Sequence, residues 1–586
     1  MSRVCFAVIL SVWLVSLTQV FAGKSPEKKA LCPHWILVGH LDKGLSDVEK
    51  RLVCGDREAK PLDPDYAWKE IPYQQAKYHL STFLQDRGYY SPIFNEPTKE
   101  EPNHIVDIGT RSFIKSWRIE GENYGVDVHQ KRKVVGSPLT PSALNEIEKW
   151  VGSQLQFYGY ACPETVATAF VENGEVVVKI KPGAQGTIAS IEQEPIPGVV
   201  DGILGRYYPF KVGDTFNGNL LTLAETRVGA SGVVESAHFR RKCEGSAVYL
   251  KNEIITGAPR LLLFSVGIDT ESLITGKASW RNTRLGPRAS LLDVTLSASQ
   301  RAQSLSGNFQ WYVFPGVPQV YINPYLQLFN RTSEPRFEFL SNRSQLGIGT
   351  ENDLSGGRLK FFIGPTLELI RTLEGVGAPT SQIASIETRA TLLSHGFEYF
   401  SGSPRAGYNL SLTGNFSNQG WGSSVTAQRL LLRGEGLLNV NNYDPPLWIL
   451  GIRGGLSAVF TPESAEPDTR LPPHYLQYLG GAQNIRGFGR QELPNDTDAG
   501  GLMSAFIGLE GRLSHTLPFG IDPFTFIDFA VLGREVFQSV SPLYWSPGIG
   551  IRWASPIGSV RVTLAHGYSN FASQHNQFYF SLGDEF

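Results

Sequence analysis

The sequence is poor in several features that would point to common classes of protein. It has only two methionines and five cysteines, and its 53 basic residues almost balance its 55 acidic ones. Such a balance gives no electrostatic reason to expect a nucleic acid or another polyanion as partner. Beyond the N-terminus, no run approaches the roughly 20 apolar residues that a membrane-spanning helix requires. The chain is nevertheless too long for one ordinary domain and predicts roughly two to four.

Motifs of common enzymes are also missing. The chain has no G-x-S-x-G elbow, no P-loop, no H-E-x-x-H and no Rossmann fingerprint. It also has no C-x-x-C motif and no Cys/His spacing typical of a metal site. His566 has no serine and aspartate at the spacing of a hydrolase site, so an ordinary structural histidine is the simpler interpretation. We therefore expect no enzyme activity, no cofactor and no metal.

The N-terminus has the pattern of a secretory signal. Arg3 precedes an apolar run over residues 4–17, and Val20-Phe21-Ala22 offers a small residue for cleavage. We expect residues 1–22 to be removed after Ala22. A membrane anchor is the weaker alternative, because the apolar run is short.

The mature chain would then enter an oxidising compartment with four cysteines. Four cysteines allow three pairings. We favour a disulfide between Cys32 and Cys54, which closes a short loop, together with a second between Cys162 and Cys243. Four buried free thiols remain the alternative.

Residues 30–258 contain a weak internal repeat with a period of roughly 75 residues. Its mark is a helix that runs into Gly-Tyr, first over residues 73–84 and then over residues 140–156. The glycines that follow, Gly88 and Gly159, fit a helix C′ position, which needs positive φ. A third, less regular copy has a helix near 220–228. Strands are expected at 35–39, 116–121, 175–181, 187–191 and 246–254, so the pattern predicts an α+β unit repeated three times.

The pattern changes near Pro259-Arg260. From there to the end, short segments alternate apolar with small or polar residues, as a strand between lipid and a polar lumen must. Only a closed barrel lets strands cross a bilayer without orphaned backbone groups. The length leaves room for roughly sixteen strands of about 9–11 residues; a soluble β-sandwich or propeller is the alternative. Examples are residues 261–268, 289–297, 307–313, 358–363, 447–456, 504–513, 524–532, 549–553, 560–565 and 578–582.

Three segments and the repeat carry a resemblance to a known family. Ile485-Arg486-Gly487-Phe488 resembles the V/I-R-G-F/Y signature of the BamA/TamA superfamily of outer-membrane assembly and translocation proteins. Residues 546–558 are similar to the G-x-G-x-R/W-x-S-P-x-G segment of that family. The alternation that ends at Phe586 resembles the C-terminal signal of bacterial outer-membrane barrels, and the α+β repeats resemble POTRA domains.

The resemblance implies a fold class and a domain plan. α+β periplasmic POTRA-like repeats should precede a transmembrane antiparallel β-barrel of about 16 strands. The expected parts are a signal peptide (1–22), three POTRA-like units (23–111, 112–184 and 185–258) and the barrel (259–586). The protein would lie in the bacterial outer membrane, with its N-terminal units in the periplasm.

The resemblance also implies a clamp inside the barrel. A loop carrying Arg486, Gly487 and Phe488 would fold into the lumen, where Arg486 would bond to Glu510 and Asp528. A guanidinium suits this task because its planar fork of donors can bind two carboxylates. Residues 526–530 look like the F-x-D-x-G strand of the family, although Ala530 replaces the glycine. An ordinary surface arginine and ordinary polar lumen residues are the alternatives.

A weak lateral seam is the second implied feature. The first barrel strand, with Leu263, Phe264 and Val266, would pair with the last strand, and the junction would open sideways into lipid. Gly583 lies where a kink would disturb that pairing. We expect Phe264 and Phe580 to be suitable positions for a disulfide across the seam. The residues expected on the last strand are Phe578, Phe580, Gly583 and Phe586.

Three functions are compatible with this organisation. The favoured one is a TamA-like factor that inserts or exports unfolded, β-rich client proteins and works with a TamB-like partner anchored in the inner membrane. Its POTRA-like units would receive extended chains at exposed sheet edges. The alternative is a two-partner secretion transporter for one exoprotein, a group that usually carries a plug helix for which residues 24–29 leave no room. A passive porin is a third possibility and would leave the N-terminal units unexplained.

Overall fold

The structure is a computed structural model of the chain. It describes residues 28–583 except 33, 56–70, 100, 401, 403, 465–467, 495–499, 540–542, 557 and 570–575. The expected signal peptide (1–22) and Phe586 lie outside the described residues. The chain divides into two compact units. The first comprises residues 1–128, 133–152 and 164–181, and the second comprises residues 129–132, 153–163 and 182–586.

The first small sheet is four-stranded, with the order β1-β2-β4-β3. Two helices cover it, and the capping box between Ser46 and Glu49 explains where the first of them, which the repeat pattern did not predict, begins. Cys32 is bonded to Cys54, so a disulfide joins β1 to the end of that helix. The elements are β1 Lys28–Cys32, β2 Trp35–Val38, β3 Ile93–Asn95, β4 His104–Asp107, α2 Asp47–Cys54 and α3 Tyr73–Gln85.

An ion pair ties the end of α3 to the start of α2. Two guanidinium nitrogens of Arg87 donate to the two carboxylate oxygens of Glu49 at 3.0 and 2.8 Å. These bonds lower the pKa of Glu49 to about 2, so the carboxylate stays ionised and the pair persists down to strongly acidic pH. Gly88, which follows, has φ of 90°, as expected for the residue that ends the helix.

The second sheet is three-stranded, with the order β5-β7-β6, and carries one long helix. Thr140 caps that helix, because its hydroxyl accepts a hydrogen bond from the Ala143 amide at 3.1 Å. Gly159, after the helix, has φ of 98°. The elements are β5 Ser116–Glu120, η1 Val128–Gln130, α4 Pro141–Phe157, β6 Glu164–Phe170 and β7 Glu175–Lys181.

The third sheet, in the second compact unit, has the order β8-β10-β9. Cys162 is bonded to Cys243 on β9. Arg227 on α5 is 4% exposed and binds Asp353 at 2.8 and 3.0 Å and Glu398 at 2.9 and 2.5 Å. Asp353 lies near the end of strand β16 and Glu398 in the short helix α6 that follows β18, so this buried ion network joins α5, which belongs to the third unit, to the barrel. The elements are β8 Thr187–Gln193, η2 Ile203–Tyr207, α5 Gly218–Ser231, β9 Ser236–Glu244 and β10 Ala247–Ile255.

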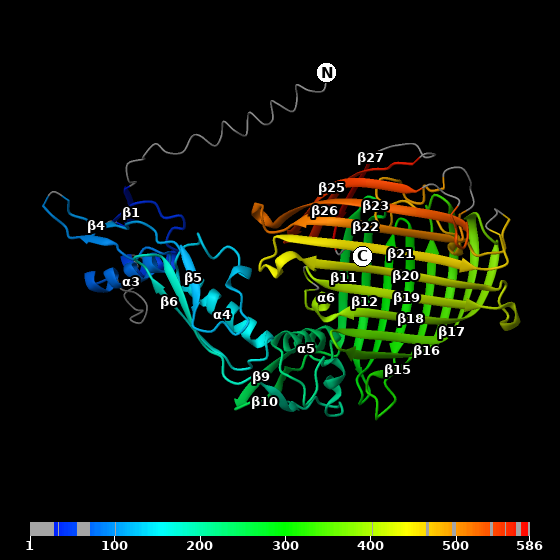
Figure 1. Cartoon of the computed structure of the whole chain (residues 1–586), viewed down its shortest axis with the longest axis horizontal. Coiled ribbons are helices and arrows are strands. Elements are labelled where there is room, and N and C mark those ends of the chain that lie inside the picture. Colours follow the sequence, from blue (N-terminus) through cyan, green and yellow to red (C-terminus); the bar gives the residue numbers. More distant parts are fainter. Residues whose placement is uncertain are drawn as a thin grey trace, which may run out of the picture. The chain divides into compact units, whose positions relative to one another are not determined.

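The remaining strands form a closed antiparallel barrel from β11 to β27 (Figure 1). β24 has only two residues, and β23 pairs directly with β25, so sixteen strands of the described chain build the wall. The predicted fold class is thereby confirmed. The strands are β11 Arg260–Asp269, β12 Leu273–Leu285, β13 Ser290–Ser299, β14 Ala302–Gln310, β15 Val320–Arg331, β16 Phe337–Leu354, β17 Gly357–Gly375, β18 Thr380–Ser394, β19 Gly407–Ser417, β20 Ala427–Asn439, β21 Trp448–Phe460, β22 Met503–Leu513, β23 Ile521–Glu535, β24 Gln538–Ser539, β25 Tyr544–Ser555, β26 Gly558–His566 and β27 Asn576–Leu582.

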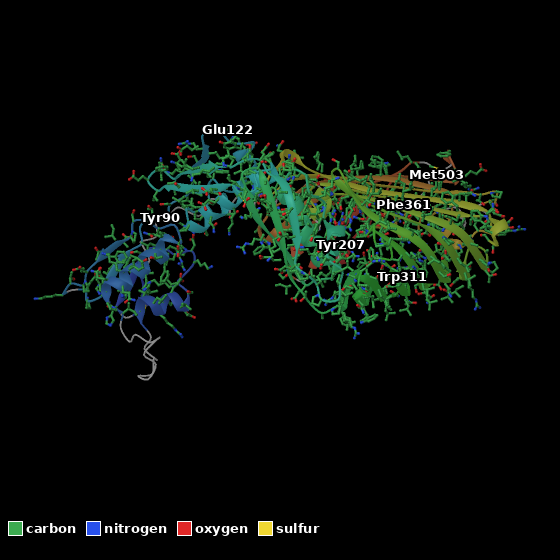
Figure 2. The ribbon with its side chains drawn as sticks, turned by 90° about the horizontal axis from the view of Figure 1, so that it is seen from below. Tyr90, Glu122, Tyr207, Trp311, Phe361 and Met503 are labelled. Atoms are coloured by element: carbon green, nitrogen blue, oxygen red, sulfur yellow. A yellow bond between two sulfur atoms is a disulfide. The ribbon has the colours of Figure 1, made fainter. Side chains whose placement is uncertain are left out.

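Several strands are longer than the expected 9–11 residues, with 18 in β16 and 19 in β17. Antiparallel hairpins can continue to pair beyond the bilayer, so the length needed to cross it is only a lower limit. Figure 2 marks Phe361 on β17 and Met503 at the start of β22. The short helices of the barrel connections are α6 His395–Tyr399, η3 Gln419–Trp421, η4 Val440–Asn442, η5 Pro473–Tyr475 and η6 Pro518–Gly520.

Alternation along the strands separates an outer apolar face from the lumen. On β17, Leu367 and Leu369 are exposed, whereas Ile370 is buried and Glu368 lies on the same side as Ile370. Within the described part of the chain, no helix is long and apolar enough to cross a membrane.

Candidate functional site

The loop between β21 and β22, residues 461–502, is the longest connection of the barrel and is called the lumen loop here. It packs against the inner wall, where Ile485 and Phe488 are fully buried beside Ala530 and Tyr544. Its turn around Asn484 is held locally. The Asn484 side-chain oxygen accepts hydrogen bonds from the amides of Gly480 at 3.0 Å and Ile485 at 2.9 Å. This turn presents Arg486 to the wall.

Arg486 forms a dense set of bonds with Asp528 on β23. Its Nε and one terminal nitrogen donate to the two carboxylate oxygens at 2.7 and 2.8 Å, and its backbone amide donates to Asp528 at 3.1 Å. The other terminal nitrogen donates to Glu510 on β22 at 3.2 Å. The structure brings the three expected residues together. Arg486 is 2% exposed and Asp528 is 0% exposed, so this pair is shielded from water, whereas the Glu510 side chain is 16% exposed. We call Arg486, Gly487, Phe488, Glu510 and Asp528 the lumen clamp.

Three further arginines surround the same two carboxylates, and sequence reasoning missed them. Arg453 on β21 donates to Asp528 at 3.0 Å and to the carbonyl oxygen of Ala482 in the loop at 2.9 Å. Arg561 on β26 donates to Glu510 at 2.8 Å, and Arg512 donates to it at 3.3 Å. No local motif marks these positions, because they meet only when β21, β22, β23 and β26 close the wall. The buried charges are therefore shared across four strands.

Gly487 lies too close to the wall to carry a side chain. Its φ is 107°, and a Cβ built on it would lie 2.3 Å from the Ser546 hydroxyl oxygen and 2.8 Å from the Gly567 amide nitrogen. The next residue, Phe488, packs edge-on against Tyr544 with ring centroids 5.8 Å apart. Close backbone approach at Gly487 thus allows Phe488 to reach its buried site.

A second glycine makes room for the clamp from the wall side. Gly508 on β22 lies directly opposite Asp528 on β23. A Cβ at Gly508 would lie 2.4 Å from a carboxylate oxygen of Asp528. Ala530, which replaces the expected glycine, packs instead in the apolar cluster with Phe488, so this departure leaves the contacts of Asp528 intact.

The lumen loop also reaches both strands beside the barrel closure. The hydroxyl of Tyr579 on β27 donates to the Phe488 carbonyl at 2.8 Å. On the other side, Glu271, in the turn after β11, accepts a hydrogen bond from the Ala482 amide at 3.1 Å. Arg490 then binds both carboxylate oxygens of Glu334, in the turn after β15, at 2.7 Å. The loop therefore spans the junction between β27 and β11 from inside.

That junction is the weakest pairing of the wall. β11 pairs with β12 at ten positions, and β27 pairs with β26 at seven. In the described chain, β11 and β27 share only two, Ile268 with Leu582 and Asp269 with Ser581. Beside them, the Thr270 amide donates to the Phe580 carbonyl at 3.0 Å, and the Phe580 amide donates to the Thr270 hydroxyl at 3.3 Å. We call this junction the seam. Among the described residues, no residue of β11 that precedes Ile268 in the sequence pairs with β27.

The residues expected at the seam do not all lie where β11 pairs with β27. Leu263, Phe264 and Val266 lie on the stretch of β11 that faces no described part of β27, and Phe264 and Val266 are each 72% exposed. Phe578 and Phe580 lie on β27. Gly583 has φ of 123° and lies just after the last paired residue, Leu582, as expected for a bend there.

One expectation about the seam is wrong. Phe264 and Phe580 are not opposite each other, because the register pairs Ile268 with Leu582 and brings Phe580 next to Thr270. Only the last two residues of β27, Ser581 and Leu582, face β11, because the earlier residues of β27 lie beyond the end of β11 at Asp269. Ile268 and Leu582 are opposite each other and are therefore suitable positions for a disulfide across the seam.

An antiparallel barrel with apolar side chains outside and a charged loop bound in its lumen defines a β-barrel of the outer-membrane type. Residues 393–586 match the Omp85 superfamily domain. This part of the barrel is an Omp85 superfamily domain, and the resemblance seen in the Arg-Gly-Phe segment is confirmed at that level. The protein lies in the bacterial outer membrane with its N-terminal units in the periplasm.

Three solved structures are similar to most of the chain. BamA from Haemophilus ducreyi, lacking POTRA domains 1–3, is 16% identical, with 80% of this chain and 99% of that chain covered at a TM-score of 0.49. CdiB from Acinetobacter baumannii is 12% identical, with 80% and 90% covered at a TM-score of 0.45. CdiB from Escherichia coli is 13% identical, with 87% and 97% covered at a TM-score of 0.43.

The lumen clamp makes a prediction for Arg486→Ala. Removing one member of a buried ion pair costs about 3–5 kcal/mol, because the carboxylates stay buried with fewer partners. We expect the lumen loop to detach and to be cleaved much faster by protease in the folded, full-length protein. Arg534→Ala, an exposed arginine on the strand that carries Asp528, is the control and should not change cleavage. Equal cleavage of both variants would contradict the clamp.

Gly487→Ala tests the close approach. The added methyl group would overlap Ser546 and force a left-handed backbone on alanine, at a cost of about 1–3 kcal/mol. We expect a lower unfolding temperature than for the wild type. Gly276→Ala on β12, where no atom lies within 4 Å of the added carbon, is the matched control. The steric account fails if the two variants unfold at the same temperature.

Proposed function

We propose that this protein is a TamA-like factor that inserts or exports β-rich client proteins through the seam. The observation that carries the proposal is the short pairing of β11 with β27. Residues 260–267 of β11 present backbone N–H and C=O groups without a described partner on the β27 side. Such groups are costly in hydrocarbon, so a client strand that pairs with them is stabilised there.

The lumen clamp supports the same proposal. Its carboxylates lie on β22 and β23, away from the seam, and bind arginines from β21, β26 and the loop. These strands can keep their arrangement while the seam opens. Opening would break the two strand pairs, the two hydrogen bonds between Thr270 and Phe580, and the contact of Glu271 or Tyr579 with the loop. Few bonds therefore oppose lateral opening, and the rest of the wall stays braced.

The N-terminal units supply candidate binding edges for clients. In the second sheet, β6 pairs only with β7 among the described strands, so its outer edge offers a place for another strand, although the Ala167 amide there already donates to the Glu148 carboxylate of α4 at 2.6 Å. Val166 and Phe170 on this edge strand are 57% and 50% exposed. An extended client, or a TamB-like periplasmic partner, could add a strand at this edge by β-augmentation.

A seam disulfide tests lateral opening. We expect Ile268→Cys with Leu582→Cys, once oxidised, to stop most client assembly, and a reducing agent to restore it. The measurement is the amount of folded outer-membrane protein in cells that depend on the variant. Both single-cysteine variants are controls. Full activity in the oxidised double variant would refute lateral opening, whereas loss of one secreted protein alone would indicate dedicated two-partner secretion.

A photocrosslinker at Val166 tests the binding edge. We expect it to capture unfolded outer-membrane proteins or a large periplasmic partner in cells, identified by mass spectrometry. Val135 is the matched control, because it is 58% exposed in the same compact unit but lies outside any strand. The same proteins captured with equal yield from both positions would speak against strand addition at β6.

A further inference from the structure

A cavity of about 400 Å³ lies on the lumen side of the barrel, apart from the lumen clamp. Strands β15, β16, β17 and β20 form its wall, and residues 474–478 of the lumen loop close it on another side. The lining residues lie on the face opposite Leu340 and Leu432, which are exposed on the outside. The cavity is therefore reached from the aqueous lumen and not from lipid.

Four arginines line this cavity and only one carboxylate does, that of Glu368. Glu368 lies 3.6 Å from the Nε2 of His474, which belongs to the loop. The arginines are Arg331 on β15, Arg343 on β16, and Arg429 and Arg433 on β20. Guanidinium groups keep their charge in proteins, so the lining carries an excess of positive charge.

Neighbouring carboxylates do not balance this charge. Arg343 bonds to Glu387, but Glu387 also pairs with Arg389 at 3.1 Å. Arg331 is 3.9 Å from Glu334, whose two oxygens already bind Arg490. Each of these carboxylates is thus shared between two arginines.

Arg429 is the clearest case of an unbalanced charge. Its guanidinium lies over the ring of Tyr475 at 5.5 Å and makes no bond to a carboxylate within the described chain. Moreover, the Nε atoms of Arg331, Arg343 and Arg429 are buried, and no acceptor for them exists among the residues that the structure describes. Buried donors without acceptors cost free energy, so oxygens that reach them would stabilise this part of the lumen.

We propose that this cavity binds a multivalent oxyanion of the phosphate type from the aqueous phase. Guanidinium forks match the tetrahedral oxygens of such an anion in geometry as well as charge, which a spherical chloride ion does not. An anion held there would join wall strands β15, β16 and β20 to the loop segment around His474. It would thereby hold in place the same loop that carries Arg486. This inference is independent of which client the protein handles.

Phosphate titration of the purified full-length protein in detergent tests the proposal. Sodium phosphate replaces sodium chloride at constant pH and ionic strength, and binding is measured by calorimetry and by the unfolding temperature. We expect saturable binding and a rise in unfolding temperature. Arg429→Gln should weaken binding about tenfold or more, since one charge-assisted contact is lost. Glu368→Gln should strengthen it, because the one lining carboxylate loses its charge.

The matched control is Arg281→Gln. Arg281 is a barrel arginine outside the cavity, bound to Asp293 at 2.8 Å, and its loss should leave phosphate affinity unchanged. Short-chain phosphatidylglycerol should bind no better than chloride. The proposal is overturned if the wild type does not prefer phosphate to chloride, if Arg429→Gln and Arg281→Gln behave alike, if Glu368→Gln does not bind more tightly, or if the lipid binds better than phosphate. The wild-type and Glu368→Gln measurements decide the matter even if Arg429→Gln does not fold.

Discussion

Backbone hydrogen bonding in hydrocarbon is the constraint on which the barrel depends. Every N–H and C=O group that faces the bilayer needs a partner, which is why strands cross it only as a closed cylinder. The described wall meets this demand through long pairings on all sides except between β11 and β27. The one incomplete pairing is therefore also the place where an incoming strand would gain the most from binding. The proposed function follows from this one short pairing.

Buried ion pairs inside the barrel join strands of the wall, whereas the backbone pairing at the seam is short. Arg486 and Asp528 form a buried pair, so removal of either residue leaves the charge of the other buried with fewer partners. Around it, arginines from separate strands bind the same carboxylates, so β21, β22, β23 and β26 are joined through the lumen. The loop extends this network to Glu271 and Glu334 at its outer end.

The same loop borders the arginine-rich cavity near His474. The parts of the loop around Arg486 and around His474 therefore face surfaces of different charge. At Arg486 the loop brings a cation to carboxylates of the wall, whereas at His474 it faces a wall with more arginines than carboxylates. A dissolved anion would complete the second contact as Asp528 completes the first. Attachment of the loop would then depend on the ionic composition of the lumen, although the clamp itself would not.

Local patterns were enough for much of the architecture. Helix faces, caps and the glycines Gly88 and Gly159 located the helices of the repeats, because such signals act within a few residues. The capping box at Ser46 was readable as well, yet the helix it begins was missed. Alternation indicated the barrel and its approximate strand number, since each strand must separate lipid from lumen. The Arg-Gly-Phe triplet singled out the loop, and its family resemblance pointed to Glu510 and Asp528.

The sequence by itself thus determined the class of fold, the order of its parts and the loop that enters the lumen. Only the tertiary structure decided the register of the seam, the partners Arg453 and Arg561 of the clamp, and the excess charge around Arg429. The physical reason is that a strand's own residues fix which face is apolar but not how far it slides along its neighbour. Contacts between β11 and β27, or between β21 and β26, exist only after sixteen strands have closed on themselves.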